Sequence, residues 1–122
     1  EIMIVVAIIA LLAAIAIPNL LRARLNANEA RARAELRGLA GAIESYAAQE
    51  GLYPTSETNL TNITPPYLNI PICNQTKNGY IFNCSNLSPY GYTVSAEPQV
   101  CNATGIKNWT VTTGNIWTEN NC

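Results

Sequence analysis

Residues 1–21, EIMIVVAIIALLAAIAIPNLL, decide the fold, because one acid, Glu1, is followed by an uncharged run from Ile2 to Leu21. A run of 20 residues is long enough to span a bilayer as a helix. Three interpretations compete. A cleaved signal peptide would begin with basic residues and have a shorter core, whereas this run begins with an acid. In a membrane anchor, Glu1 would mark the water-side edge. In the third interpretation Glu1 pairs with an amine from another copy, since an unpaired carboxylate beside lipid is costly.

The sequence after this run predicts an amphipathic helix. Apolar residues recur at helical spacing on one face, which we expect to lie on a sheet: Ala32, Leu36, Leu39, Ile43, Tyr46 and Ala47. Opposite charges lie four residues apart in two pairs: Glu29 with Arg33, and Arg31 with Glu35. Gly51 and Pro54 then predict the end of the helix. A helix over residues 1–50 would be about 75 Å long, so its apolar half must enter a membrane or contact other copies of the chain.

The second half of the chain predicts a small sheet. Residues 52–78 are rich in turn formers and indicate a long connecting loop with at most a short helical turn. Four strands are expected after it: Gly79–Asn83, Tyr90–Glu97, Lys107–Thr113 and Asn115–Glu119. Gly114 and Asn115 fit a hairpin turn. A long helix packed on small antiparallel strands predicts an α+β fold.

The segment EIMIVVAIIALLAAIAIPNLLRARLNANEA, residues 1–30, resembles the amino-terminal segment of type IV pilins and of the pseudopilins of type II secretion. The resemblance covers roughly residues 1–35. In that family a prepilin peptidase removes a basic leader, a methylated Phe begins the mature chain, and a Glu follows four residues later. That Glu corresponds to Glu1. The resemblance implies that the mature amino terminus, the expected partner of Glu1, precedes this sequence.

The resemblance also implies a type IV pilin fold with two parts. Residues 1–27 would form the membrane and filament-core helix. Residues 28–122 would form the head, with the second half of the helix, the αβ-loop over 52–78 and the antiparallel sheet over 79–122. Pro18 lacks a backbone donor and should kink or break the helix. In assembled pilins a segment before this proline is often extended, so we expect residues 10–18 to unwind in a filament, with a simple kink as the alternative.

The composition argues against several other classes of protein. The chain has 7 basic and 8 acidic residues, every acid is Glu, and there is no His or Asp. The commonest general base and metal ligand are thus missing, so we expect no catalytic residues, metal or cofactor. Five arginines between residues 22 and 37 are interspersed with glutamates. That pattern favours a solvated or inter-subunit face over nucleic-acid binding, and we expect this chain to bind no nucleic acid directly.

Four cysteines lie in the second half of the chain: Cys73, Cys84, Cys101 and Cys122. An even number in a polar region indicates disulfides and an oxidising compartment. Pairing by neighbourhood predicts Cys73–Cys84 and Cys101–Cys122, although four cysteines allow three pairings and the sequence alone does not choose. The resemblance implies that the second bridge ties the carboxy terminus to the sheet.

Seven Asn-x-Ser/Thr triplets, none with Pro in the middle, crowd the same half: Asn59, Asn62, Asn74, Asn83, Asn86, Asn102 and Asn108. Such a triplet is an acceptor for N-linked glycans where the enzymes exist. A region rich in Asn, Ser and Thr also produces triplets by chance. The alternatives are glycosylation at these asparagines and a surface of bare amides and hydroxyls.

The resemblance implies a structural subunit of a type IV pilus. Such a subunit waits in the inner membrane, is processed by the prepilin peptidase, and is polymerised by the assembly machinery into an extracellular homopolymer. The filament would serve adhesion, surface motility or DNA uptake. One alternative is a pseudopilin of type II secretion, although major pseudopilins commonly bind calcium through Asp in the last loop and this sequence contains no Asp. The other is a minor pilin that acts as a binding module.

Overall fold

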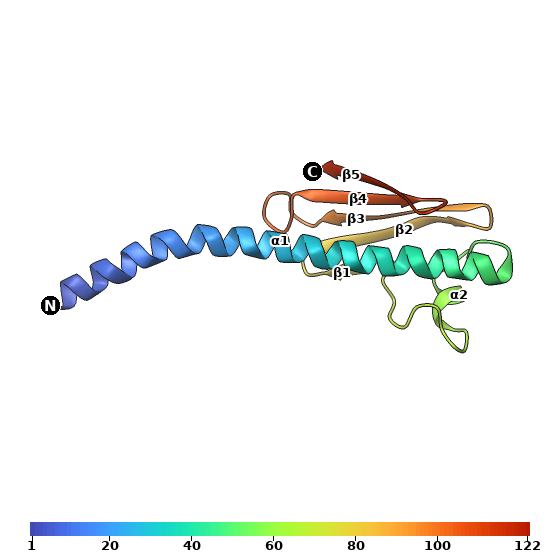
Figure 1. Ribbon diagram of the computed structural model, residues 1–122, viewed down its shortest axis with the longest axis horizontal. Helices are drawn as coiled ribbons and strands as arrows, with labels where there is room; N and C mark the ends of the chain where they lie inside the picture. The colour runs from blue at the N-terminus through green and yellow to red at the C-terminus, as the bar shows by residue number, and fades with distance from the viewer.

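The computed structural model describes residues 1–122 as a long helix that carries a five-stranded antiparallel sheet along its second half (Figure 1). The sheet has the strand order β1-β2-β3-β4-β5, and each strand is antiparallel to the next. This arrangement confirms the α+β, pilin-like fold expected from the sequence. The elements are α1 (Ile2–Glu50), α2 (Thr58–Thr61), β1 (Thr76–Lys77), β2 (Tyr80–Ser88), β3 (Gly91–Pro98), β4 (Lys107–Thr112) and β5 (Ile116–Asn121).

Helix α1 is continuous over 49 residues and contains Pro18 in its interior. The helix curves along its length, and its first half extends beyond the head (Figure 1). It ends at Gly51, which has a φ of 83° and donates its N–H to the carbonyl of Ala47 at 2.9 Å. In the single subunit α1 therefore passes through Pro18 without a break. The unwinding of residues 10–18 in a filament stays a prediction.

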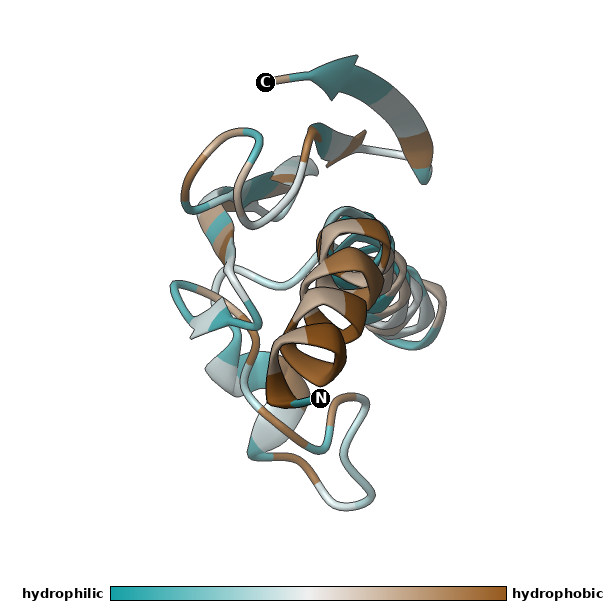
Figure 2. Cartoon of the chain, turned by 90° about the vertical axis from the view of Figure 1, so that its left-hand side faces the viewer, coloured by the Kyte–Doolittle hydropathy of each residue, from teal (hydrophilic) through white to brown (hydrophobic).

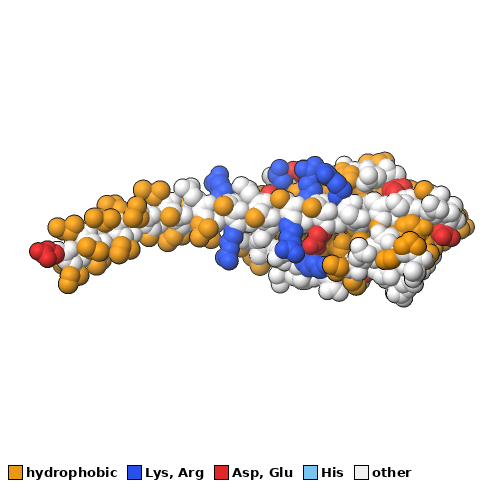
Figure 3. All heavy atoms as spheres, turned by 60° about the horizontal axis from the view of Figure 1, so that its bottom comes forward, with side chains coloured by type: hydrophobic (Ala, Val, Ile, Leu, Met, Phe, Trp, Pro, Cys, Tyr) orange, Lys and Arg blue, Asp and Glu red, His pale blue; other side chains and the backbone are white.

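The first half of α1 is a bare apolar rod. Almost every residue from Glu1 to Arg24 is exposed; Ile2 is 80% and Leu11 68% accessible to solvent. Figure 2 shows the apolar end of the helix standing clear of the sheet, and Figure 3 shows a red acid at its tip and blue basic side chains at its base. Helix α1 is long enough and apolar enough to cross a membrane. We call residues 2–21 the apolar rod.

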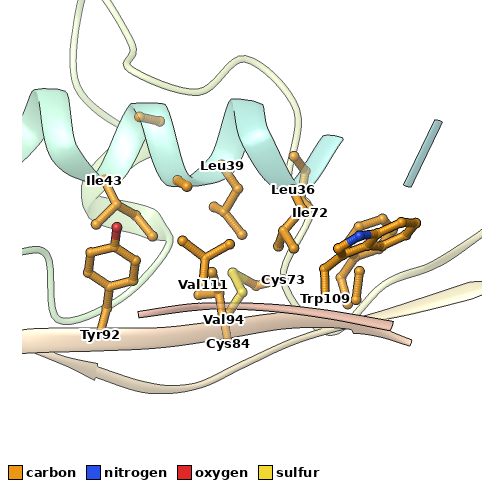
Figure 4. Packing of buried hydrophobic residues seen from close by; sticks show 14 of the residues in the cluster. Leu36, Leu39, Ile43, Ile72, Cys73, Cys84, Tyr92, Val94, Trp109 and Val111 are labelled. Atoms are coloured by element: carbon orange, nitrogen blue, oxygen red, sulfur yellow. A yellow bond between two sulfur atoms is a disulfide. The ribbon is translucent and has the colours of Figure 1, made fainter. Parts of the chain in front are cut away.

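The second half of α1 packs its apolar stripe on the sheet (Figure 4). Leu36, Leu39 and Ile43 are fully buried and point toward Val94 of β3 and Val111 of β4, which are also fully buried. The expected helix face is confirmed for its first four members, whereas the last two are only half-buried and lie at its edge: Tyr46 and Ala47. This contact fixes the direction of the apolar rod relative to the head.

Three of the four expected strands lie within two residues of their observed bounds. The exception is the first, expected over 79–83, because β2 continues to Ser88 through an irregularity between Asn83 and Asn86. Polar and apolar residues do not alternate between Asn83 and Ser88, so the sequence pattern predicts an end of the strand that is too early. The expected hairpin turn is present, and Gly114 and Asn115 both have positive φ, 85° and 61°, which Gly and Asn accept most readily.

We predict that Leu39→Ala lowers the free energy of unfolding of the full chain in detergent micelles by about 2–5 kcal/mol, because it leaves a cavity between α1 and the sheet. Leu11→Ala, the same change on the exposed rod, is the matched control and should leave the melting of the head unchanged. Denaturant unfolding followed by near-UV circular dichroism measures both. Equal effects of the two substitutions would contradict the assigned core.

Candidate functional site

The exposed rod and the charges around it form the candidate site for assembly. Glu1 is exposed at the tip and belongs to none of the chain's ion pairs. The next charged residue along the helix is Arg22, about 32 Å away at 1.5 Å per residue. Within one subunit the rod therefore offers no cation to Glu1, and a partner for this carboxylate must come from outside residues 2–21.

The arginines of α1 divide into two groups. Arg22 and Arg24 are exposed at the base of the rod and belong to no ion pair. Farther along, Arg31 lies 3.4 Å from Glu35, which confirms one of the two expected pairs. Arg37 lies over the ring of Trp117 at 6.0 Å from its centroid. Arg33 is exposed on the head-packed half of the helix and also belongs to no ion pair. Two of the unpaired cations, Arg22 and Arg24, thus lie where the rod meets the head.

The second expected pair, Glu29 with Arg33, is wrong. The Oε1 atom of Glu29 instead accepts hydrogen bonds from the backbone N–H groups of Ile106 at 2.9 Å and Lys107 at 3.3 Å. These amides begin β4, and a backbone donor at a fixed position competes well with a flexible, solvated arginine. Glu29 therefore joins α1 to the sheet rather than to its own neighbour.

Glu44 makes the corresponding connection at the other end of β4. Its carboxylate accepts hydrogen bonds from the phenols of Tyr92 at 2.7 Å and Tyr53 at 3.2 Å, and from the N–H of Gly114 at 3.1 Å. Burial, followed by the hydrogen bond to Glu44, raises the pKa of the Tyr92 phenol above its ordinary value. Burial and the Glu44 charge also raise the pKa of Tyr53. Nothing in the sequence pattern indicated this role, because two of the three donors, Tyr92 and Gly114, lie 48 and 70 residues away in the chain.

Two disulfides and a third glutamate hold the loops of the head. Cys73 and Cys84 are joined with their Cα atoms 5.3 Å apart, and Cys101 and Cys122 with theirs 5.8 Å apart. These are the pairs expected from neighbourhood. Glu57 accepts the N–H groups of Ile72 at 2.6 Å and Cys73 at 2.8 Å. The long loop is thereby tied to β2, and the carboxy terminus to the loop after β3.

The seven Asn-x-Ser/Thr triplets all lie on the head. Five of the asparagines are exposed: Asn62, Asn74, Asn83, Asn86 and Asn102. Asn59 and Asn108 are partly covered, and Asn59 donates its side-chain amide to Thr55 at 3.3 Å. The exposed amides are accessible to a modifying enzyme in the single subunit.

Comparison with known proteins finds relatives in two classes of filament system, and no protein-family model matches the chain. It is 31% identical over 81 residues to the type II secretion system core protein G of Vibrio cholerae, and 33% over 82 residues to that of Escherichia coli K12. It is 36% identical over 84 residues to the type IV wide pilus major component PilA4 of Thermus thermophilus. Each match covers 66% of this chain, and 56%, 57% and 64% of the respective relatives. The chain thus matches about three fifths of the length of these proteins.

We predict that Glu44→Gln lowers the free energy of unfolding by about 1–3 kcal/mol, because charge-assisted hydrogen bonds from two tyrosines and one amide are weakened. Glu50→Gln is the matched control on the same helix, since Glu50 is exposed and forms no ion pair. Denaturant titration of each full chain gives the difference. If Glu50→Gln is as destabilising as Glu44→Gln, the hydrogen bonds to the Glu44 carboxylate contribute nothing specific to the stability of the head.

A second prediction concerns alkaline pH. Because the folded state raises the pKa of Tyr92 above the unfolded value of about 10, folding favours the neutral phenol. Its contribution is complete below about pH 10 and is lost as the pH rises toward the folded pKa. Stability should therefore fall above about pH 10, and Tyr92→Phe should make that fall shallower. Some slope should remain, since burial also raises the pKa of Tyr80. Thermal unfolding across the alkaline range measures both slopes.

Proposed function

We propose that the chain is the major structural subunit of a type IV pilus, within the family of type IV pilins and pseudopilins that its fold and these relatives support. In this proposal the subunit is held in the inner membrane by the apolar rod and then polymerises into an extracellular filament. The head faces outward and serves adhesion, surface motility or DNA uptake by the fibre. The prepilin peptidase and the pilus assembly machinery would be its processing and assembly partners.

The observation that carries the proposal is the exposed apolar rod on a helix anchored in the head. Thirteen large apolar side chains between Ile2 and Leu21 are exposed. Burying such a side chain stabilises by about 1.5–3 kcal/mol, so leaving all of them in water costs roughly 20 kcal/mol or more. That exceeds the stability of about 5–15 kcal/mol of an ordinary domain. The rod therefore has to be covered by lipid or by other copies of itself. A filament supplies those other copies.

Glu1 and Pro18 have separate roles in the proposed assembly. Glu1 would dock against the terminal amine of a subunit already in the filament, so that two charges in an apolar core are paired and set the axial register. Near Pro18, residues 10–18 would unwind, because neighbouring helices can satisfy the freed backbone groups. The support is the position of each residue, one at the tip of the rod and one near its base.

The alternative is a pseudopilin of type II secretion, which the similarity to two core proteins G favours. We prefer the pilus because the sequence contains no Asp, the residue through which major pseudopilins commonly bind calcium. The two disulfides fit either alternative, since the periplasm and the cell exterior are both oxidising. The exposed asparagine triplets are proposed glycan acceptors on the pilus fibre. Electron microscopy of surface fibres labelled through this chain separates the alternatives, since surface fibres built of this chain support the pilus.

We predict that Glu1→Leu abolishes or strongly reduces filaments while the head stays folded, because the charge that docks each new subunit is removed. Glu50→Leu removes an exposed glutamate from the other end of α1 and is the control. Fibres sheared from cells and quantified against total subunit give the result. A chain with Glu1→Leu that inserts in the membrane and still assembles normally would exclude the docking role.

A further inference from the structure

A hollow of about 570 Å³ lies at the end of the head from which the rod emerges. One wall is a face of α1, with residues at spacings of three and four: Leu21, Arg24, Leu25 and Asn28. The other wall consists of the residues before β2 and the loop closed by the Cys101–Cys122 disulfide: Asn78, Gly79, Asn102, Ala103 and Thr104. Asn28 donates its amide to the carbonyl of Thr104 at 3.0 Å and joins the two walls.

The hollow lies at the level of the lipid headgroups when the rod spans a bilayer. The apolar rod ends at Leu21, so this residue marks the boundary of the hydrocarbon. Arg24 then stands about 4.5 Å and Asn28 about 10 Å farther along the helix. The polar layer of a leaflet is about 5–8 Å thick. Leu21 thus borders the acyl chains, Arg24 lies at the level of the phosphates, and Asn28 lies just beyond the headgroup layer.

The charge of the hollow favours an anion. Arg24 is its one charged lining residue, and neither Arg24 nor Arg22 belongs to an ion pair in the chain. The opposite wall is polar and contains no acidic residue, with Asn78 and Asn102 among its lining residues, so nothing there repels an anion. A guanidinium is well suited to bind a phosphate.

We propose that this hollow binds the headgroup of an anionic phospholipid, with the phosphate on Arg24 and an acyl chain along Leu21 and Leu25. The proposal rests on the membrane-held stage of the proposed function. The bound lipid would hold the head in one orientation on the membrane surface, because the two walls of the hollow come from α1 and from the sheet side of the head.

The test reconstitutes the full chain in nanodiscs with equal amounts of phosphatidylglycerol and phosphatidylcholine, and counts the lipids retained on each chain by native mass spectrometry. We expect retention of phosphatidylglycerol in preference to phosphatidylcholine. Arg24→Gln should lower that retention about tenfold or more, as expected when a charge-assisted phosphate contact is lost. Arg22→Gln is the matched control, because it removes the same charge outside the hollow, about 3 Å away along the helix.

Equal losses in the Arg22 and Arg24 variants would overturn the proposal in favour of general attraction between basic residues and an anionic surface. Displacement of the lipid by excess inorganic phosphate would overturn it in favour of a free phosphate. Ala103→Trp fills the hollow at an exposed position without changing charge, and should also lower retention. If Ala103→Trp perturbs folding, the comparison of the two arginines still decides. A chain that does not insert in the nanodisc contradicts the proposed function, whereas one that inserts without lipid preference contradicts the hollow alone.

Discussion

The packing of one face of α1 on the sheet is the constraint on which the rest of the structure depends. Leu36, Leu39 and Ile43 are fully buried there, while the same helix continues without interruption into the exposed rod. The part of the rod between Pro18 and the head is therefore held in a fixed direction relative to the head, since bending a continuous helix requires broken hydrogen bonds or an element such as Pro18. A neighbour that binds the rod also determines where the head lies, and this is what a regular filament requires of its subunit.

The small core does not hold the sheet alone, and two glutamates of α1 fasten β4 at both ends. Glu29 accepts the amides that begin β4, and Glu44 accepts the amide of Gly114 just after it. Fifteen residues of helix separate them, about 22 Å, which is close to the length of a six-residue strand with its flanking residues. Helix and strand thus match in length, and each carboxylate prevents the sheet from sliding along the apolar stripe. The disulfides act on the loops at the sheet edges, and Glu57 assists the first of them by accepting the N–H groups of Ile72 and Cys73.

The sequence predicted the parts of this structure that depend on local periodicity. The apolar rod, the buried stripe, the end of α1 at Gly51 and the β4–β5 turn at Gly114 each have a short-range signal, so they were found. The predicted end of β2 was wrong because the last residues of this strand pair with β3 and show no apolar pattern. The predicted pairing of Glu29 was wrong because the backbone donors that it accepts lie 77 and 78 residues away. The hollow beside Arg24 could not be predicted, since its walls meet only after folding.

In the proposed function the rod has to suit two environments in turn, a membrane and a filament, and its chemistry explains why one helix could occupy both. Lipid tails and packed helices are similarly apolar, so a side chain such as Leu11 gains little by moving from one to the other. Polar groups at the two ends of the rod are therefore what distinguishes the environments. In the proposed function, lipid headgroups would surround Arg22 and Arg24 only in the membrane, whereas an amine from another subunit would reach Glu1 only in the filament. In this view transfer into the filament exchanges a contact at the base of the rod for a contact at its tip, while the apolar surface between them stays covered throughout.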